Sequence, residues 1–290
     1  YPLRRQRQMC IRDRPLIYPC HRVVKADGKI GGFSSLQGVP QKIRMLRLED
    51  VEVMQNESKY RIEQPLLLNH KNIAKGIDYL CTKDAKLAAW IKKLPRFKLV
   101  TDNLSTPFQA LLEAIVYQQL TGRAAKTIFN RVLDFFGNPK EISPLDILRS
   151  EEDELRTTGL SGPKILAIKD LAEKNLSGHL PDLEQMMQMS NQQIVSKLVK
   201  IRGIGRWTAE MLLIFRLGRA DILAAGDYGL KKGLAVLQKR KSLPSSAELK
   251  KEGEKFKPYR TIASWYLWRI AEKSCREADE KKCHRQRACL

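Results

Sequence analysis

Asp227 is a carboxylate residue with glycines close on both sides, between Gly226 and Tyr228-Gly229. It stands directly before an apolar periodicity that predicts a helix over 230–237. An aspartate at this place can serve as the helix N-cap, because the first amides of a helix need acceptors. Taken by itself, the residue favours that structural role. A carboxylate held in place can also stabilise positive charge in a transition state, or orient and deprotonate water.

A short turn with two glycines precedes Asp227. It reads Gly203-Ile204-Gly205 and has an arginine on each side, Arg202 and Arg206. Glycine tolerates unusual backbone angles and lets another group approach closely, and N–H groups at the start of a helix suit a phosphate. Apolar residues recur at helical spacing before and after the turn. The pattern predicts a helix, a hairpin and a helix that grip the backbone of a nucleic acid.

The composition favours the same class of partner. Lysine and arginine total 53 against 32 acidic residues, which gives a net charge of +21 over 290 residues. Such an excess favours a polyanion, although a merely soluble basic protein would also show it. No apolar run reaches the roughly 20 residues of a membrane span, and no signal peptide is expected. Six cysteines do not make a secreted disulfide framework, so a reducing compartment is expected.

Three further motifs accompany the hairpin along the chain. They are Thr106-Pro107-Phe108-Gln109-Ala110-Leu111 before Tyr117-Gln118-Gln119-Leu120, Gly159-Leu160-Ser161 before Lys164, and Lys257-Pro258-Tyr259-Arg260 before Ser264-Trp265-Tyr266-Leu267-Trp268-Arg269. With the hairpin and Gly226-Asp227, they resemble the helix-hairpin-helix DNA glycosylases from about residue 73 to 271. The chain is most similar to the alkylation-repair branch, 3-methyladenine DNA glycosylase II. The resemblance implies an all-α domain of two helical subdomains with a cleft between them, acting on double-stranded DNA with alkylated bases.

The resemblance also implies a role for each matching residue. In that family the enzyme extrudes the damaged nucleotide from the duplex. Trp207 and Trp268 would then wall the base pocket, where an indole face attracts a purine that alkylation has made cationic. Asp227 would face the sugar and stabilise the oxocarbenium character of C1′. Gln119 or Leu120 would fill the gap that the base leaves, and a polar helix end is the alternative reading of these two residues.

The residue after the Gly-x-Gly-x of the hairpin indicates how the reaction ends. Bifunctional relatives have a lysine there that forms a Schiff base and cuts the strand, whereas this chain has Trp207. The resemblance therefore implies a monofunctional hydrolase that leaves an abasic site and requires no cofactor. In the family, carbonyls of the hairpin also hold a monovalent cation, Na⁺ or K⁺. Val199, Ile201 and Ile204 would supply those carbonyls here.

The end of the chain contains three cysteines, Cys275, Cys283 and Cys289. Some glycosylases of the superfamily bind an iron–sulfur cluster through four closely spaced cysteines. Three cysteines at these intervals do not match that pattern, so no iron–sulfur cluster is expected. His284 could supply a fourth zinc ligand, but the intervals fit no common zinc finger.

A separate motif, Pro19-Cys20-His21-Arg22-Val23, lies near the start of the chain. Residues 15–53 resemble the C-terminal part of O6-alkylguanine-DNA alkyltransferases, whose cysteine accepts an alkyl group while a histidine held by a glutamate draws off the thiol proton. Carried over, these roles fall on Cys20, His21 and Glu49. The DNA-binding part of that family lies upstream of the motif and has no counterpart here. A partly irregular, inert remnant is therefore the alternative to an active methyl acceptor.

These motifs predict the layout of the chain. Residues 1–14 are expected to be disordered, and 9–14 resemble translated sequencing adapter more than native protein. They precede the alkyltransferase segment over 15–53, a linker over 54–72, the glycosylase domain over 73–271 and a basic tail over 272–290. Helices are predicted over 73–94, 107–120, 123–136 and 262–271, with short helices over 143–178. A capping box predicts a further helix start at Ser190, and no strand pattern is visible after Val53.

Three functions stay open at this stage. The first is a base excision repair glycosylase for purines of the 3-methyladenine and 7-methylguanine type. The second is a non-catalytic helix-hairpin-helix DNA-binding protein, and the third is a methyl acceptor that acts through Cys20. The sequence does not set the preference among 3-methyladenine, 7-methylguanine, ethenoadenine and hypoxanthine. We expect an intracellular monomer located with DNA, in the cytoplasm or nucleoid of a prokaryote or the nucleus of a eukaryote.

Overall fold

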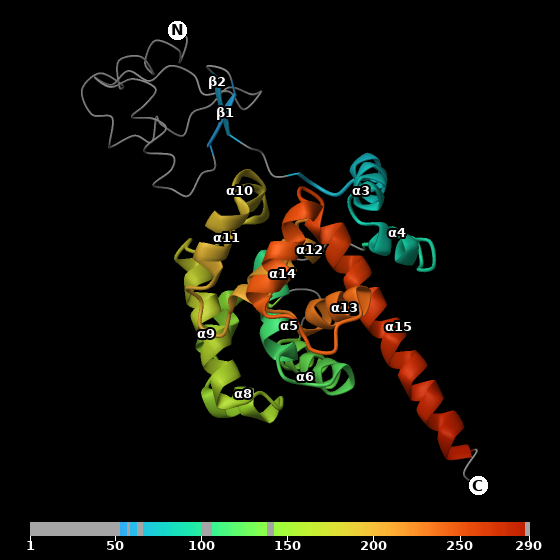
Figure 1. The fold of residues 1–290 in the computed structure, drawn as a ribbon. Coiled ribbons are helices and arrows are strands. Elements are labelled where there is room, and N and C mark those ends of the chain that lie inside the picture. Colours follow the sequence, from blue (N-terminus) through green and yellow to red (C-terminus); the bar gives the residue numbers. More distant parts are fainter. Residues whose placement is uncertain (1–52, 57–58, 63–65, 100–105, 138–141, 288–290) are drawn as a thin grey trace. The chain divides into compact units, whose positions relative to one another are not determined.

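The computed structural model describes residues 53–56, 59–62, 66–99, 106–137 and 142–287, and its regular elements are nearly all helices (Figure 1). In chain order they are β1 (Val53–Asn56), β2 (Lys59–Ile62), α3 (His70–Lys83), α4 (Ala85–Ile91), α5 (Pro107–Tyr117), α6 (Gly122–Phe135), α7 (Pro144–Arg149), α8 (Glu152–Thr157), α9 (Gly162–Leu176), α10 (Leu183–Gln188), α11 (Asn191–Leu198), α12 (Arg206–Phe215), α13 (Tyr228–Gln238), α14 (Ser246–Gly253), the 3₁₀-helix η2 (Glu254–Phe256) and α15 (Arg260–Arg287). The predicted helical fold class is confirmed.

The chain divides into two compact units, Tyr1–Pro65 with Glu184–Ser196, and Leu66–Leu183 with Lys197–Leu290. In the first unit, β1 and β2 pair antiparallel, with Val53 opposite Ile62. The prediction that no strand follows Val53 is therefore wrong. Strands of four residues are too short for an alternating pattern to stand out from a polar sequence.

The capping box predicted at Ser190 is present in the same unit. The hydroxyl of Ser190 accepts a hydrogen bond from the amide of Gln193 at 3.2 Å, and the side chain of Gln193 accepts one from the amide of Ser190 at 2.9 Å. Two N–H groups at the start of α11 are satisfied in this way, which explains why the helix begins here.

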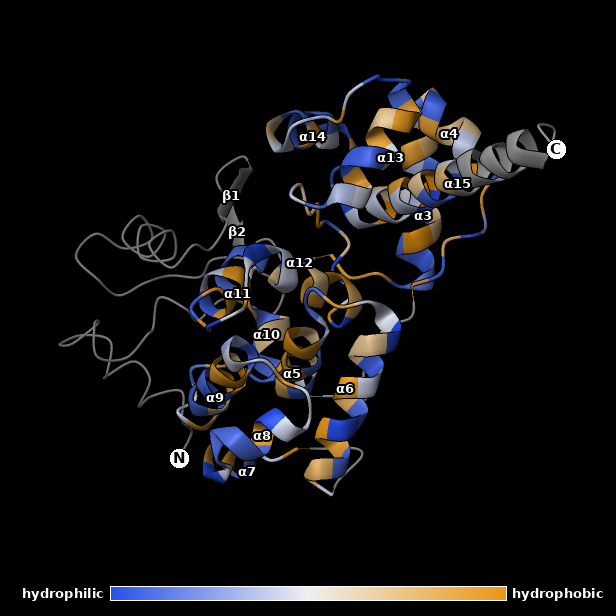
Figure 2. Ribbon diagram, turned by 90° about the horizontal axis from the view of Figure 1, so that it is seen from below, coloured by the Kyte–Doolittle hydropathy of each residue, from blue (hydrophilic) through white to orange (hydrophobic). Residues whose placement is uncertain are grey.

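One hydrophobic core of the second unit forms around α13 and α15, which lie side by side (Figure 1). Residues of α3, α4 and α14 complete this core. Trp265 is 6% exposed and packs against Tyr266 and Phe97, with ring centroids 5.0 and 5.3 Å away. Trp265 is therefore a residue of the core rather than of a binding surface. Hydrophobic residues recur along both helices (orange in Figure 2), which buries one side of each.

A second group of helices in this unit surrounds α5. Thr106 caps α5 by accepting a hydrogen bond from the amide of Gln109 at 3.3 Å, and Pro107 occupies the first turn, so the helix begins at the residue where it was predicted to begin. The helix packs against α6, α9 and α12. Its buried residues include Leu111, Leu112, Ile115 and Val116, which recur at helical spacing. This burial fixes the place where α5 ends, beside the hairpin.

The structure corrects two helices that the sequence patterns predict. The single helix predicted over 73–94 is two helices, α3 and α4, because Asp84 ends the first and caps the second by accepting hydrogen bonds from the amides of Lys86 and Leu87 at 2.9 and 3.0 Å. The first of them begins at His70 rather than Ile73, because Asn69 caps it by accepting a hydrogen bond from the amide of Asn72 at 2.8 Å. The last, α15, continues beyond Ala271 to Arg287, into the segment predicted as a tail (Figure 1). Residues 272–287 are rich in Glu, Lys, Arg and Ala, which favour helices without an apolar periodicity.

Candidate active site and nucleic-acid interface

The side chain of Asp227 lies at the start of α13, between two tryptophans. Its Oδ1 accepts hydrogen bonds from the amide of Leu230 and from Nε1 of Trp268, both at 2.8 Å. Its Oδ2 accepts one from Nε1 of Trp207, also at 2.8 Å. The same carboxylate is therefore the N-cap of α13 and the acceptor for both indoles, so the two roles considered from the sequence are compatible.

The surroundings of this carboxylate leave it open to a ligand. Asp227 is half-buried, whereas Trp207 is 48% exposed. Trp268 is half-buried and stacks on Phe215, with ring centroids 6.0 Å apart and planes 21° from parallel. Because both indole N–H groups are neutral donors, they orient the carboxylate without cancelling its charge. The structure thus brings the three predicted site residues together at an accessible place.

The absence of a side chain at Gly229 allows Trp268 to approach Asp227. A Cβ atom at Gly229 would lie 2.8 Å from Cδ1 of Trp268 and 3.1 Å from Oδ1 of Asp227. Both distances are shorter than ordinary van der Waals contact. The glycine two residues after the carboxylate is thus required by the close packing of Trp268.

The predicted hairpin lies between α11 and α12. Gly203 has φ +78°, in the left-handed region that favours glycine, and a Cβ there would be 2.9 Å from Cβ of Ala167. The amide of Ile204 donates a hydrogen bond to the carbonyl of Ile201 at 3.0 Å, and both side chains are buried. Gly205 is the N-cap residue of α12. The backbone conformation agrees with the turn that the two glycines predict.

Arg206 has a partner that the sequence pattern did not reveal. Its Nε donates to Oε1 of Glu210 at 2.9 Å, one helical turn later. Burial raises the pKa of Glu210, while the charge of Arg206 acts in the opposite direction. The side chain of Arg206 nevertheless remains 60% exposed, so the ion pair does not remove it from the surface that a phosphate would reach.

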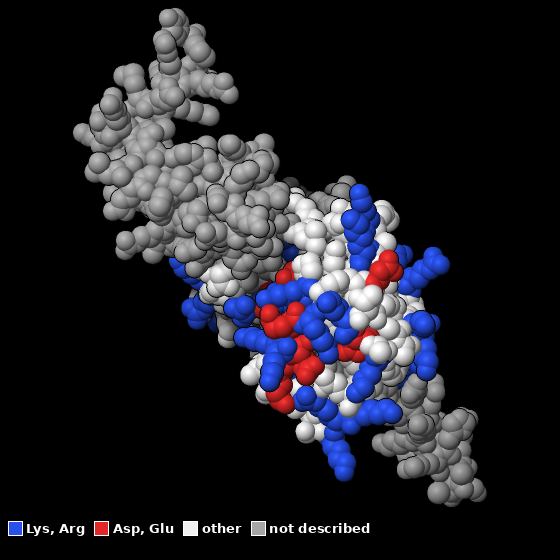
Figure 3. Space-filling view, turned by 45° about the horizontal axis from the view of Figure 1, so that its top comes forward, with Lys and Arg blue, Asp and Glu red and all other residues white. Residues whose placement is uncertain are grey.

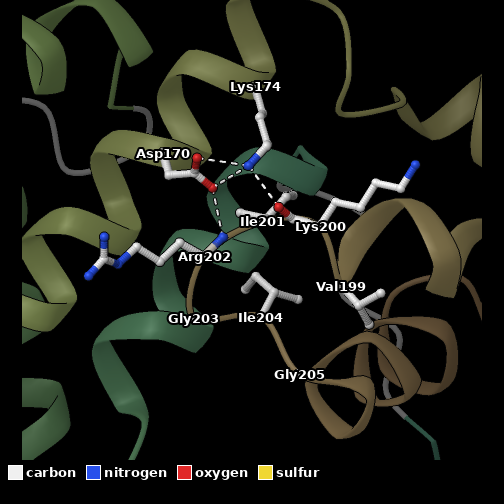
Figure 4. A pocket seen from close by; sticks show the side chains of 9 residues that line it. All are labelled: Asp170, Lys174, Val199, Lys200, Ile201, Arg202, Gly203, Ile204 and Gly205. Atoms are coloured by element: carbon white, nitrogen blue, oxygen red, sulfur yellow. Dashed lines mark hydrogen bonds and ion pairs between the residues drawn. The ribbon is translucent and has the colours of Figure 1, made fainter.

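Two residues of α9 brace the hairpin from behind, and the sequence reasoning missed both (Figure 4). Oδ2 of Asp170 accepts a hydrogen bond from the amide of Arg202 at 2.7 Å. Nζ of Lys174 donates to the two oxygens of Asp170 at 2.7 and 2.6 Å, and to the carbonyl of Lys200 at 2.7 Å. Although burial opposes it, the hydrogen bonds from Lys174 and Arg202 lower the pKa of Asp170. An Asp–Lys pair four residues apart is common on helix surfaces, so this spacing did not indicate a contact with the hairpin.

The brace and the hairpin together line an open pocket of about 620 Å³ (Figure 4). The three residues predicted to offer carbonyls to a monovalent cation, Val199, Ile201 and Ile204, all line it. Backbone carbonyls are suitable ligands for such a cation. That Val199, Ile201 and Ile204 would hold such an ion stays a prediction.

The predicted plug residues follow α5 and are tied to the hairpin. Gln119 has φ +58°, and both Gln119 and Leu120 are exposed. The preceding residue, Gln118, donates a hydrogen bond from Nε2 to the carbonyl of Gly203 at 2.8 Å. The turn that carries the plug residues is thereby joined to the turn that would contact the phosphate backbone.

A groove of about 240 Å³ lies between α5 and α12. Phe215, which stacks on Trp268, is one of its lining residues. Two charged residues also line it, Glu113 of α5 and Arg216 at the end of α12, and they form an ion pair at 3.2 Å. Neither was singled out from the sequence, because their partners are far apart in the chain.

Comparison with known proteins identifies the family. Residues 112–258 match the model of the HhH-GPD superfamily of base excision DNA repair proteins. The chain belongs to this superfamily. This member is 37% identical over 166 residues to DNA-3-methyladenine glycosylase 1 of Schizosaccharomyces pombe, over 57% of this chain and 73% of that protein. It is 34% identical over 198 residues to the alkylbase DNA glycosidase-like protein of the same yeast, over 66% of this chain and 91% of that one.

Solved structures agree with the family assignment. The 3-methyladenine DNA glycosylase of S. pombe in complex with abasic DNA matches with a TM-score of 0.62 and 33% identity, over 67% of this chain and 95% of that one. The DNA-3-methyladenine glycosidase of Bacillus halodurans matches with a TM-score of 0.64 and 33% identity, over 70% and 91%. The predicted family is confirmed, and its function class is that of a DNA-binding glycosylase of base excision repair. No described helix has both the length and the apolar character of a membrane span.

The N-terminal resemblance is confirmed at the level of the family model. Residues 6–51 match the DNA-binding domain of 6-O-methylguanine DNA methyltransferases, contrary to the expectation that the DNA-binding part of that family has no counterpart here. The match also begins before residue 15, where the resemblance was expected to start. Cys20, His21 and Glu49 lie outside the residues that the structure describes. Their predicted role as an acceptor site therefore stays a prediction.

Proposed function

We propose that this glycosylase is a monofunctional hydrolase that releases alkylated purines, of the 3-methyladenine and 7-methylguanine type, from double-stranded DNA. The observation that carries the proposal is the carboxylate of Asp227, held by the indole N–H groups of Trp207 and Trp268. The similar proteins from S. pombe and B. halodurans bear the name 3-methyladenine glycosylase or glycosidase, which agrees with this class of substrate.

The reaction follows from the charge that develops on the sugar. The bond between C1′ and the purine nitrogen breaks, and its electron pair leaves with the base, which alkylation has already made cationic. Asp227 stabilises the oxocarbenium character at C1′, because its negative charge is fixed in place before the reaction begins. A water molecule then bonds to C1′ and loses a proton to the carboxylate or to solvent. The products are the free base and an abasic site.

The indoles contribute to the choice of base. An electron-rich indole face attracts a cation, so Trp207, with nearly half its surface exposed, suits an alkylated purine better than a neutral one. Alkylation also makes the purine a good leaving group, so the reaction needs little help from a general acid. No lysine hydrogen-bonds to Asp227 in the described part of the chain, and Trp207 occupies the position of the Schiff-base lysine. We therefore expect no strand cleavage.

The hairpin and the net charge support binding to the DNA backbone. Gly203, Gly205 and Arg206 lie at the exposed start of α12. Lysine and arginine side chains are spread over the face drawn in Figure 3, with acidic side chains gathered near the middle of its described surface. We further propose that the enzyme acts as a monomer, needs no organic cofactor or iron–sulfur cluster, and uses at most Na⁺ or K⁺ at the hairpin.

The test uses a duplex with a single 7-methylguanine. The wild-type protein should release 7-methylguanine, identified by chromatography, and the strand should break only after treatment with alkali. Asp227→Asn should bind the same duplex normally but release at least about a hundredfold less base, the scale on which one fixed electrostatic group acts. Asp134→Asn, at an exposed position of α6, is the matched control and should behave as wild type.

Three results would count against the proposal. Strand breaks without alkali would show a bifunctional enzyme. Normal base release by Asp227→Asn would show that the reaction does not need the carboxylate. Binding without any release by the wild type, over a range of alkylated bases, would favour a non-catalytic DNA-binding protein.

The match of residues 6–51 to the methyltransferase family supports a second candidate activity. Cys20 would accept a methyl group from O6-methylguanine, so that the C–O bond breaks, an S–C bond forms and guanine remains in the DNA. DNA with a radiolabelled O6-methyl group should then label the protein, and Cys20→Ala should abolish the label. Absence of label on the wild type would leave the segment as an inert remnant.

A further inference from the structure

Two aromatic rings connect the groove between α5 and α12 to the proposed catalytic carboxylate. Phe215 lines the groove and stacks on Trp268, and Nε1 of Trp268 donates to Asp227. A base that contacts these two aromatic rings would therefore lie next to the groove. Its volume of about 240 Å³ is larger than a single purine needs.

The wall of this groove is apolar except for a few groups. Leu111 and Met211 are among its apolar lining residues, and Glu113 and Arg216 form an ion pair across it. Nη2 of Arg216 contacts Oε2 of Glu113 at 3.2 Å. Within the described residues, no group donates a hydrogen bond to the other carboxylate oxygen, Oε1. The side chain of Glu113 is 39% exposed, so this oxygen can be reached by a ligand.

A hydroxyl donor lies one helical turn beyond this carboxylate. Burial, and then the negative charge of Glu113, raise the pKa of Tyr117. The hydroxyl of Tyr117 therefore stays protonated at neutral pH and can donate a hydrogen bond. Together, Glu113 and Tyr117 give the groove one charged acceptor and one neutral donor, the combination that reads the edge of a purine.

We infer that Glu113 is the residue that selects cationic purines, by accepting a hydrogen bond on Oε1 from an amino or ring N–H group of the extruded base. Arg216 orients the carboxylate through Oε2. The inference rests on the proposed function, which supplies the base but not this contact. A hydrogen bond to a charged acceptor is stronger than one between neutral groups, and the positive charge of the alkylated ring adds to it.

The ion pair by itself does not account for this arrangement. Partly exposed ion pairs contribute little to stability, because solvent screens them and both side chains lose freedom. A carboxylate on an apolar wall also loses hydration when the groove fills. This loss is compensated only if the group that fills the groove brings a positive charge or a hydrogen-bond donor to the carboxylate.

The test measures binding, so that it does not depend on the chemical step. Two duplexes are compared, one with 2′-fluoro-7-methylguanosine and one with 2′-fluoroguanosine, because the fluorine blocks hydrolysis of both. Wild type and Glu113→Gln are titrated with each duplex. Glutamine keeps the size of the side chain and removes its charge. Glu152→Gln, at an exposed position of α8, makes the same change in net charge away from the groove.

The preference for the methylated duplex, a ratio of two dissociation constants, is the readout. Glu113→Gln should lower this ratio about tenfold, the size expected for one charge-assisted hydrogen bond. Glu152→Gln should leave it at the wild-type value. Affinity for the 2′-fluoroguanosine duplex should stay the same in all three proteins, which also reports that each is folded.

Two outcomes would overturn the assignment. An unchanged ratio would show that Glu113 does not read the charge of the base. An equal loss of affinity for both duplexes would show that the ion pair with Arg216 only holds α5 and α12 together. Failure of the proposed function is a separate result, namely that wild type releases no base from hydrolysable 7-methylguanine DNA.

Discussion

Gly229→Ala should separate catalysis from stability in this glycosylase. The new Cβ would lie 2.8 Å from Cδ1 and 3.3 Å from Nε1 of Trp268, whereas ordinary contacts are about 3.5–4 Å. The indole must therefore move away by roughly 0.5–1 Å. Such a shift would break the 2.8 Å hydrogen bond from Nε1 of Trp268 to Asp227.

The size of the effect follows from that hydrogen bond. A hydrogen bond to a charged group contributes about 1.5–3 kcal/mol. If Asp227 is positioned by Trp268 for the transition state, base release should slow about 10- to 100-fold. Stability should change by less than the rate does, because Gly229 is in α13 and alanine favours a helix by up to about 1 kcal/mol over glycine, which offsets part of the lost hydrogen bond.

The assay is single-turnover release of 7-methylguanine with enzyme in excess, together with thermal unfolding followed by circular dichroism. Gly226→Ala is the matched control on the other side of Asp227, since outside the two neighbouring residues no atom lies within 4 Å of a Cβ placed there. The expected pattern is slow release with only a small decrease in Tm for Gly229→Ala, and wild-type release for Gly226→Ala. A wild-type rate in Gly229→Ala would refute the role of the Trp268 contact. A large decrease in Tm would show that the steric clash disrupts the fold rather than the site.

Two further predictions concern the braces of the hairpin. Asp170→Asn should weaken binding to undamaged DNA by about three- to tenfold, because the amide of Arg202 and the ammonium of Lys174 lose a charged acceptor. In wild type the lowered pKa of Asp170 contributes stability above the unfolded-state pKa of about 4, and this is lost as the pH falls through the lower folded pKa. Acid unfolding should therefore depend less on pH near and below 4 in the variant, and an identical acid profile would contradict the brace. Gln118→Ala removes the donor to the carbonyl of Gly203 and should slow extrusion of the base by about fivefold, one neutral hydrogen bond, with unchanged binding of undamaged DNA. Fluorescence of 2-aminopurine beside the lesion, followed after rapid mixing, measures that step, and an unchanged rate would show that the plug turn does not depend on the hairpin.

The sequence by itself determined the local features of this protein. Two glycines predict the hairpin because Gly203 needs a left-handed φ that other residues adopt only with strain. The N-cap role of Asp227 and the start of α5 at Thr106-Pro107 depend on atoms three residues apart, so the residue types suffice. The resemblance to the glycosylase family then predicted that Trp207 and Trp268 lie in one site with Asp227. Helical periodicity alone could not have predicted this.

The tertiary structure decided which distant side chains meet. The contacts of Asp170 with Arg202, Gln118 with Gly203 and Glu113 with Arg216 span 32, 85 and 103 residues. No local pattern encodes them, because each depends on how α5, α9 and α12 pack. The antiparallel pairing of β1 and β2 escaped prediction for a related reason, since each strand is stabilised by its partner more than by its own four residues. Residue type and spacing thus specified the hairpin and the carboxylate. Packing between helices determined the groove and the contacts of Asp170 and Gln118 that hold the hairpin in place.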